Sequence, residues 1–219
     1  TYVGGVISSD TTWSMAQSPY VVTDPILVSE GVTLTIEAGV KVQFRTPAIS
    51  YCFIRVDGTL VARGTQEDRI LFTRETEGDR WAGIAFMDSS ADWDPATQTG
   101  SILEQCILEF GGEMAQGAWF NMHVEIYDAS PLIQRCIFRR GAGVYAQGKD
   151  ARPHIVENIF TDLHSTAVYS LSSSAFVSEN AIIDNDNEGV EIKGAEGYLT
   201  LVNNLIHENR GAGIEMVRQ

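Results

Sequence analysis

The chain has 219 residues, 44% hydrophobic and 20% charged, and its formal net charge at pH 7 is −14. This is enough apolar material for a sizeable core, and a chain this acidic should be repelled by nucleic acid and by anionic lipid, which excludes both as expected partners. The three cysteines, Cys52, Cys106 and Cys136, lack CxxC spacing, which argues against a disulfide framework or a zinc site, and no apolar run reaches the roughly 18 residues of a membrane-inserting helix.

Residues 1–25 are predicted to form an irregular N-terminal cap. Prolines stand at positions 19 and 25, and the segment carries the large aromatic residues Trp13 and Tyr20. Proline interrupts regular pairing, whereas aromatic side chains can cover the first edge of the structure that follows. We expect residues 26–219 to be one continuous domain.

Residues 26–86 are predicted to form short strands. Runs rich in Val, Ile, Leu, Thr and Phe are separated by Gly, Asn, Asp and Ser. The segments ILVSEGVTLTIEAGVKVQF and FIRVDGTLVARGTQEDRILFTR align when Gly31 is matched with Gly58, and RWAGIAF supplies a further strand. This half therefore shows a repeat, although a less regular one than the half that follows.

From residue 101 onward the repeat is clear. Five segments align without gaps around one shared position, called the anchor. The number of residues from one anchor to the next is nearly constant over the last four anchors. Apolar residues occupy the columns three before and two after the anchor. A period of about 22 residues with fixed apolar columns is typical of a solenoid, in which each repeat buries its apolar face against its neighbours. The anchors are Cys106, Cys136, Asn158, Asn180 and Asn204.

The anchor residues indicate which solenoid this is. Leucine-rich repeats share the period, but their Leu-x-x-Leu-x-Leu pattern and helical stretch are not evident. An Asn at an inward bend can hydrogen-bond the backbone and the equivalent Asn one coil away, which predicts a parallel β-helix of about eight coils, ~40 Å long. Cys106 and Cys136 continue this column; free thiols are the preferred interpretation, with a disulfide as the alternative.

The stretch TTWSMAQSPYVVTDPILVSEGVTLTIEAGVKVQF, followed by VDGTLVARGTQEDRILFT and the Asn-anchored repeats, resembles the bacterial and archaeal right-handed parallel β-helix proteins of the pectin lyase-like superfamily. The resemblance covers nearly the whole chain. It implies an all-β, right-handed parallel β-helix. It leaves the function open, because the superfamily holds polysaccharide lyases, hydrolases and epimerases as well as surface proteins without known activity.

Two insertions are the candidate ligand-binding segments, because loops that project from a solenoid commonly carry its binding surface. The first spans residues 87–100 and the second residues 112–123. Exposed aromatic rings beside carboxylates would suit a sugar ring, whereas the alternative is that they only pack their own loops onto the coil. The candidate residues are Asp92, Trp93, Asp94, Trp119 and Phe120.

An acidic column offers a candidate metal site. Four residues after successive anchors come Arg140, Asp162, Asp184 and Glu208. Stacked carboxylates repel one another unless they are solvated, paired or bridged by a cation, so a weak calcium site is the alternative to a solvated corner in which Arg140 pairs with Asp162. No other cofactor is expected. The run DNDNEG at 184–189 resembles the start of an EF-hand loop, but its twelfth position is Ala195, so we interpret it as a turn.

No catalytic residue is assigned. Mannuronan-type epimerases of the superfamily carry Asp-Pro-His, and the nearest match here, Arg152–His154, lacks the aspartate. The other histidines, His123, His164 and His207, stand at unlike positions in their coils, which argues against an imidazole metal site. Lysines are scarce, and no basic groove for a polyuronate is apparent.

The C-terminal stretch GIEMVRQ shows no capping helix. We expect either further chain beyond it or head-to-tail self-association through an open last coil. The predicted function is a non-catalytic extracellular or cell-surface β-helix module, with its signal peptide removed, that serves in adhesion, carbohydrate binding or assembly. The alternative is a polysaccharide lyase or epimerase acting on the flank of the β-helix.

Overall fold

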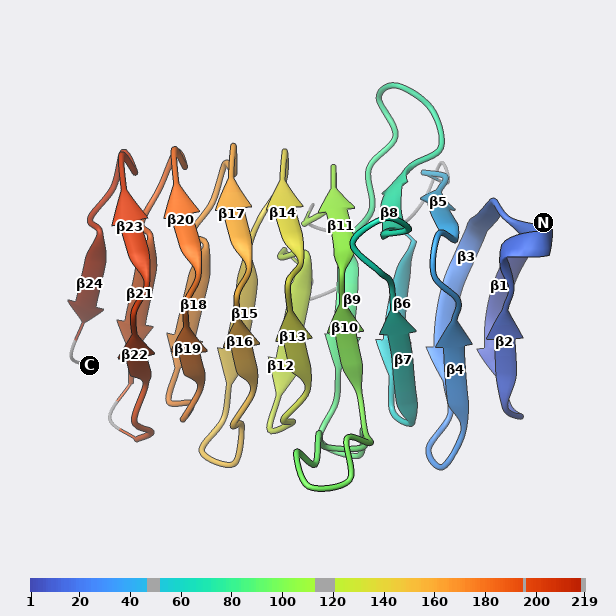
Figure 1. Ribbon diagram of the computed structural model, residues 1–219, viewed down its shortest axis with the longest axis horizontal. Coiled ribbons are helices and arrows are strands. Elements are labelled where there is room, and N and C mark those ends of the chain that lie inside the picture. Colours follow the sequence, from blue (N-terminus) through green and yellow to red (C-terminus); the bar gives the residue numbers. More distant parts are fainter. Residues whose placement is uncertain (47–51, 113–120, 195, 218–219) are drawn as a thin grey trace.

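The computed structural model describes residues 1–46, 52–112, 121–194 and 196–217. Within these ranges the chain is almost entirely strand and turn, and the only helical element is one 3-10 turn, η1 (Met15–Gln17). The strands are stacked in coils along one long axis, with the N-terminus at one end and the C-terminus at the other (Figure 1). All pairings between strands are parallel, which requires each strand to be followed by a crossover before its neighbour is reached.

One side of the solenoid, called face 1, is an eight-stranded parallel sheet. Each coil contributes one short strand to it. In sheet order, face 1 consists of β2 (Thr11–Trp13), β4 (Thr33–Ile36), β7 (Thr59–Arg63), β10 (Ile102–Glu104), β13 (Leu132–Gln134), β16 (His154–Val156), β19 (Phe176–Ser178) and β22 (Thr200–Val202). From β4 onward, strands adjacent in the sheet are separated by two other strands in the sequence, whereas β2 and β4 are separated by a single long strand.

A second sheet folds around the other sides. It has 16 strands in two limbs, and the long strand β3 (Tyr20–Val28) joins them because its first half pairs with β5 and its second half with β6. Strand β1 (Tyr2–Ile7) also pairs with β3. The first limb, face 2, continues with β5 (Lys41–Phe44), β8 (Ile70–Arg74), β11 (Cys106–Glu109), β14 (Ile137–Arg139), β17 (Ile159–Thr161), β20 (Ala181–Ile183) and β23 (Leu205–His207).

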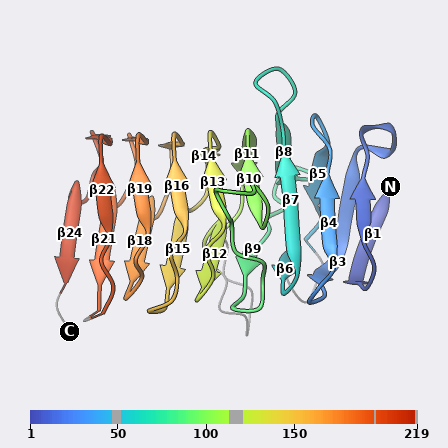
Figure 2. The same ribbon diagram turned by 60° about the horizontal axis from the view of Figure 1, so that its bottom comes forward.

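The second limb, face 3, completes each coil. The chain runs from face 1 to face 2 to face 3 and then returns to face 1 one level further along the axis (Figures 1 and 2). Face 3 consists of β6 (Phe53–Val56), β9 (Gly83–Phe86), β12 (Val124–Tyr127), β15 (Val144–Gln147), β18 (Val168–Leu171), β21 (Val190–Lys193) and β24 (Ile214–Val217). The chain is thus an all-β, right-handed parallel β-helix, and its length is consistent with the expected eight or so coils.

The strand register confirms the repeat in the second half and corrects it in the first. Face 2 pairs Ile107 with Ile137 and then Ile159, so the anchors before them are equivalent, as predicted. In the first half Thr33 pairs with Thr59, so Gly58 lies one position beyond the equivalent of Gly31. Gly31 has a positive φ of 74°, whereas Gly58 has none and instead lies against the carbonyl of Ser29.

The core lies inside the coils, where alternate residues of every strand point inward. Aromatic rings stack along its axis: the centroids of Phe44 and Trp81 are 4.2 Å apart, and those of Phe138 and Phe160 are 4.7 Å apart. The imidazole of His123 lies between these pairs, 5.7 Å from Trp81 and 6.0 Å from Phe138. The core is therefore a continuous column in which each ring contacts the next coil.

The predicted Asn ladder is present. Asn180 donates from its amide to the carbonyl of Ile155 and to Oδ1 of Asn204, each at 2.9 Å, and its Oδ1 accepts from the backbone and the amide of Asn158. The column continues as predicted into Cys136, whose backbone N–H donates to Asn158 Oδ1 at 2.8 Å. Cys106 and Cys136 are both buried as free thiols.

A second ladder was not predicted. Asn185, within the DNDNEG turn, is buried, donates to the carbonyl of Phe160 at 3.2 Å and bonds Oδ1 of Asn209 at 2.8 Å. Both ladders lie where the chain leaves a strand and turns. They supply partners for backbone groups that the sheets cannot reach.

The corners on either side of face 2 are built from residues with positive φ. The residue before each anchor and the residue four after it adopt φ between 53° and 60°, although none of them is glycine. This left-handed conformation reverses the chain sharply between two sheets. The two corner columns are Gln105, Arg135, Glu157, Glu179 and Asn203, and Phe110, Arg140, Asp162, Asp184 and Glu208.

Candidate functional site

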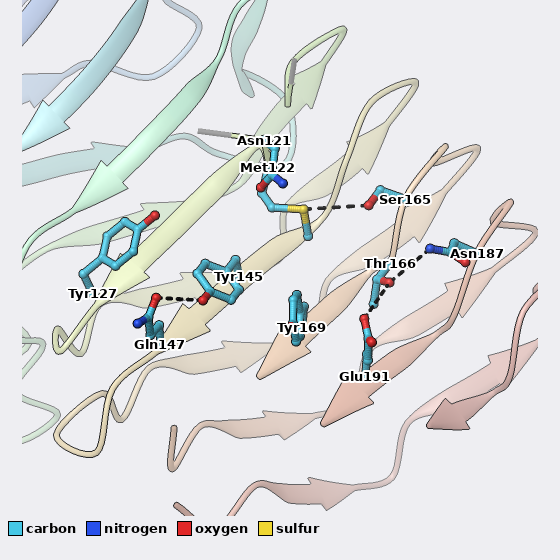
Figure 3. A pocket seen from close by; sticks show the side chains of 10 residues that line it. All are labelled: Asn121, Met122, Tyr127, Tyr145, Gln147, Ser165, Thr166, Tyr169, Asn187 and Glu191. Atoms are coloured by element: carbon cyan, nitrogen blue, oxygen red, sulfur yellow. Dashed lines mark hydrogen bonds between the residues drawn. The ribbon is translucent and has the colours of Figure 1, made fainter. Parts of the chain in front are cut away.

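A groove of about 400 Å³ lies on the outer surface of face 3. It crosses strands β12, β15, β18 and β21, and it is bordered by the turns that lead into them (Figure 3). The volume lies within the usual range for a ligand site, roughly 300–1,000 Å³. The groove is lined by Asn121, Met122, Tyr127, Tyr145, Gln147, Ser165, Thr166, Tyr169, Asn187 and Glu191.

Strand register aligns the floor of the groove. In these strands the first residue points into the core and the second points outward, so second residues of successive coils form one outward row. The pairings of β12 with β15, β18, β21 and β24 place one residue from each coil in the row. In order, the row is Glu125, Tyr145, Tyr169, Glu191 and Glu215.

Three tyrosines form an aromatic strip along the groove. The ring centroids of Tyr127 and Tyr145 are 6.0 Å apart, and those of Tyr145 and Tyr169 are 5.0 Å apart. The Tyr145 hydroxyl donates to Oε1 of Gln147 at 2.7 Å. Burial, together with the neighbouring Tyr169, raises the pKa of Tyr145 to about 12, so the Tyr145 hydroxyl keeps its proton at neutral pH.

A buried carboxyl lies beside this strip. Glu125 is wholly buried, and its two oxygens accept hydrogen bonds from the Tyr127 hydroxyl and, at 2.6 Å, from the backbone N–H of Asn121. Burial raises the pKa of Glu125 above its usual range, and these hydrogen bonds oppose that rise. Burial and the bond to Glu125 also raise the pKa of Tyr127. The pair fixes the Tyr127 ring at one end of the groove.

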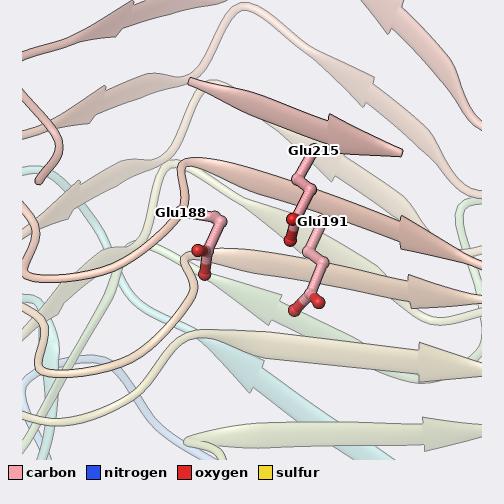
Figure 4. Close-up of side chains that lie close together, drawn as sticks. All are labelled: Glu188, Glu191 and Glu215. Atoms are coloured by element: carbon pink, nitrogen blue, oxygen red, sulfur yellow. The ribbon is translucent and has the colours of Figure 1, made fainter. Parts of the chain in front are cut away.

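The other end of the groove is acidic. Carboxylate oxygens of Glu188, Glu191 and Glu215 lie within 4.8 Å of one another (Figure 4), and the Thr166 hydroxyl donates to Glu188 at 3.1 Å. Lys193 forms an ion pair with Glu191, and its Nζ lies 5.2 Å from the ring centre of Tyr169. The hydrogen bond to Glu191 raises the pKa of Lys193, which therefore stays protonated. Glu191 is buried and Glu188 and Glu215 are half-buried, and we assign no ion here.

These groups together suit a polyhydroxylated ligand. The tyrosine faces offer apolar contact, while the amides of Gln147 and Asn187 and the carboxylate of Glu191 offer donors and acceptors. The described residues that line the groove include no Lys or Arg, and Lys193, which lies over the Tyr169 ring, is paired with Glu191. A strongly anionic ligand would meet carboxylates without compensating positive charge.

The first predicted ligand-binding loop, residues 87–100, lies against the outside of face 1. Asp92 accepts the backbone N–H of Ser130 at 2.7 Å, and Asp94 accepts from the backbone N–H of Ala96 and the hydroxyl of Thr97. The guanidinium of Arg63 lies 5.3 Å from the Trp93 ring centre. All three predicted side chains thus have contacts that hold the loop, and their role toward a ligand stays a prediction.

The other predicted residues fall in two groups. Trp119 and Phe120 lie outside the described residues. Asp162, Asp184 and Glu208 are exposed in a corner column; Asp162 pairs with Arg140 at 3.6 Å, as predicted, and Glu208 pairs with His207 at 3.2 Å. Their calcium site stays a prediction.

The histidines have contacts that account for their positions. The buried His123 donates from Nδ1 to the carbonyl of Ala142, and its Nε2 accepts the backbone N–H of Gly111 at 3.1 Å. Burial lowers the pKa of His123 to about 3, so both ring nitrogens are used by a neutral imidazole. His154 lies on face 1 with its ring 5.7 Å from Phe176, away from the groove.

Sequence reasoning missed the groove, although a signal was available. An apolar residue stands ten positions after each of the last three anchors, namely Val168, Val190 and Ile214. The residue after each of these must point outward, which gives Tyr169, Glu191 and Glu215. The corresponding pairs in the coils before them are Val144–Tyr145 and Val124–Glu125.

Two family models together cover almost the whole chain. A pectate-lyase-like β-helix domain matches residues 5–118, and a right-handed β-helix region matches residues 119–219. Neither a curated protein nor a solved structure matched at a significant level. In the described ranges, no helix is both long enough and apolar enough to cross a membrane.

Proposed function

Because the chain belongs to the pectate-lyase-like family of right-handed β-helix proteins, we propose that it is a non-catalytic module that binds a glycan chain in the groove of face 3. The observation that carries this proposal is the strip of Tyr127, Tyr145 and Tyr169, whose ring centroids are 6.0 and 5.0 Å apart, with the ring planes at 75° and 52° to each other. A strip of this kind offers apolar ring surface on successive coils to a chain of sugar rings.

The polar lining supports the same ligand class. Sugar rings combine an apolar face with hydroxyls at their edges, and a groove for them needs aromatic surface bordered by hydrogen-bonding groups. Gln147 borders the strip on one side, and Asn187 and Glu191 border it on the other. The ligand would lie across coils, so that each coil contributes one contact and the regular spacing sets the register.

The charge of the groove favours a neutral glycan over a polyuronate. Glu191 lines the groove and lies close to Glu188 and Glu215, and Lys193 is already paired with Glu191. The net charge of −14 acts in the same direction over longer distances. We therefore assign neutral polysaccharides as the ligand class, bound at an extracellular or cell-surface location in adhesion or assembly.

Affinity electrophoresis tests the proposal. Gels cast with neutral polysaccharides should retard the protein, whereas gels cast with polyuronates should not. Tyr145→Ala and Tyr169→Ala should each weaken the retardation about tenfold, because an aromatic contact of this kind contributes about 1–3 kcal/mol. Tyr198→Ala is the matched control, since Tyr198 is 87% exposed and does not line the groove. Equal retardation of all variants would contradict the proposal.

A second candidate, a polysaccharide lyase or epimerase, is favoured by one observation. Glu125 combines a pKa that burial raises above its usual range with a hydrogen bond from Tyr127, and a carboxyl perturbed in this way is a candidate general acid or base. The raised pKa of Lys193 speaks against that residue as a base. The appearance of unsaturated or epimerised uronides with the wild type, and its loss in Glu125→Gln, would replace the binding function with this one.

A further inference from the structure

Face 2 carries a continuous aliphatic stripe on its outer surface. Register places one residue from each coil in the stripe; two of the six are exposed, Ile159 at 41% and Leu205 at 59%, and the other four are half-buried. A flat parallel sheet with such a stripe offers contiguous apolar area of the kind found at protein interfaces. The stripe consists of Leu71, Ile107, Ile137, Ile159, Ala181 and Leu205.

The charges that border the stripe are separated along the solenoid axis. The residues concerned lie in the two corner columns and on the outer surface of face 2. In the coils of β8 and β14 these positions carry arginines, and in the coils of β17, β20 and β23 they carry carboxylates. Glu67 and Asp68 lie in the turn before β8, outside these columns. The arginines are Arg69, Arg74, Arg135, Arg139 and Arg140, and the carboxylates are Glu157, Asp162, Glu179, Asp184 and Glu208.

Internal pairs neutralise only the middle of this pattern. Arg135 pairs with Glu157 at 2.8 Å, Arg140 pairs with Asp162 at 3.6 Å, and Glu109, the acid within the basic half, pairs with Arg139. Towards the ends, Arg69 donates to the backbone carbonyl of Arg135, and Arg74 lies over the Phe110 ring. Within the described ranges, Glu179 and Asp184 have no ion-pair partner.

We propose that face 2 is an interface for a second copy of this chain, related by a two-fold axis that runs parallel to the strands near β14. Such an axis reverses the direction of the solenoid and places the coil of β8, with Arg69 and Arg74, on the coil of β20, with Glu179 and Asp184, in the other copy. The arginines of the β14 coil lie at the axis, where each is already paired with a carboxylate of its own copy. The surface is then self-complementary, as an isologous interface requires. A parallel arrangement would set basic half against basic half, so charge selects the antiparallel one.

The stripe fits the same arrangement. With Ile137 at the axis, Ile107 of one copy faces Ile159 of the second, and Leu71 faces Ala181, a large side chain against a small one. On the rims, the coil of Arg69 and Arg74 faces the coil of Glu179 and Asp184. The charges left without partners within one copy therefore meet across the interface.

The size of the surface predicts a weak dimer. Five coils at ~4.8 Å spacing, each about six residues wide at ~3.3 Å per residue, cover roughly 500 Å² per copy. The total of about 1,000 Å² is below the usual ~1,200–2,000 Å² of stable complexes. Rim charges lie within the reach of salt screening, so association should weaken as ionic strength rises.

Sedimentation velocity over a concentration series tests the interface. The wild type should pass from monomer to dimer as its concentration rises, and added salt should shift that transition to higher concentration. Ile159→Lys should remain monomeric throughout. Phe176→Lys is the matched control, because Phe176 is 37% exposed on face 1 of the adjoining coil, and this variant should still dimerise. Thermal melts of both variants exclude unfolding as the cause.

Complementary charge reversals supply a second measurement. Glu179→Arg with Asp184→Arg, and separately Arg69→Glu with Arg74→Glu, should each abolish the homodimer by like-charge repulsion. An equimolar mixture of the two double variants should dimerise again. A wild type that stays monomeric at every concentration would overturn the proposal, and so would a dimer that Ile159→Lys leaves unchanged.

Discussion

At the scale of single residues, His123 links the core to pH. The folded protein holds its imidazole neutral, with a pKa of about 3, whereas the unfolded imidazole titrates near 6.5. As the pH falls from ~6.5 towards 3, only the unfolded state binds the proton, so the free energy of unfolding should fall by about 1.4 kcal/mol per pH unit. Above ~6.5 this residue should have no effect on the pH dependence.

Urea denaturation at pH 7 and pH 5 measures this effect. The wild type should lose about 2 kcal/mol more than His123→Gln between these two pH values. Protonation of carboxylates affects both proteins alike and cancels in the difference. Identical pH profiles for the wild type and His123→Gln would show that this imidazole is not held neutral.

Asp184 tests the left-handed corners. Its φ of 58° disfavours any residue with a Cβ, and β-branched residues most of all. Asp184→Gly should leave stability unchanged or raise it by up to about 1 kcal/mol, whereas Asp184→Val should lower it by about 1–2 kcal/mol. Thermal melts compare the two. Asp186 is the control, because it is exposed in the same turn and lacks a positive φ. The cost of a left-handed backbone should therefore not add to the difference in stability between Asp186→Gly and Asp186→Val.

At the scale of elements, the Asn ladder holds adjacent coils in register. Asn180 is buried and bonds the coil before it as well as the coil after it. Asn180→Ala leaves buried backbone groups of both neighbours without partners, and we expect a loss of about 2–4 kcal/mol in the free energy of unfolding by urea. Asn187→Ala, outside both ladders, should lose less than about 1 kcal/mol. An equal loss of stability in Asn180→Ala and Asn187→Ala would contradict the role of the ladder in holding adjacent coils together.

The elements that could be predicted from the sequence are those in which similar residues recur after a nearly constant number of positions. The Asn column, the stacked Cys106 and Cys136, and the strands around them follow from that spacing, which the pairing of β11, β14, β17 and β20 reproduces. The match of Gly31 with Gly58 was off by one position, because glycine alone does not identify a turn position: Gly31 has a positive φ, whereas Gly58 lies close to another backbone.

The groove escaped prediction because its residues are unlike one another. Glu125, Tyr145 and Tyr169 lie in one row but are not all of one residue type. A search for sequence repeats finds positions at which the same kind of residue recurs, so it passes over this row. Their row emerges only when strand pairing fixes which side chains point outward. Asn185 was missed as a ladder residue for a related reason, since Asn in a turn serves both exposed and buried roles.

At the scale of the whole molecule, the three faces divide the proposed tasks. Face 3 carries the tyrosine groove, face 2 the stripe for a second copy, and face 1 the loop with Trp93. An antiparallel pair on face 2 leaves both grooves open, so two sites on one assembly could hold one long glycan and bind it with increased avidity. The expected head-to-tail association through the last coil stays a prediction, and it would give species that keep growing beyond a dimer.

The central claim is that the tyrosine strip binds a neutral glycan, and calorimetric titration tests it most directly. A length series of oligosaccharides from a retarding polysaccharide should bind with increasing affinity until the chain spans Tyr127 to Glu191, and then level off. The variant with both Tyr145→Ala and Tyr169→Ala should lose this binding, whereas Tyr198→Ala should keep it. Binding that is independent of the two tyrosines, or no binding at any length, would contradict the account.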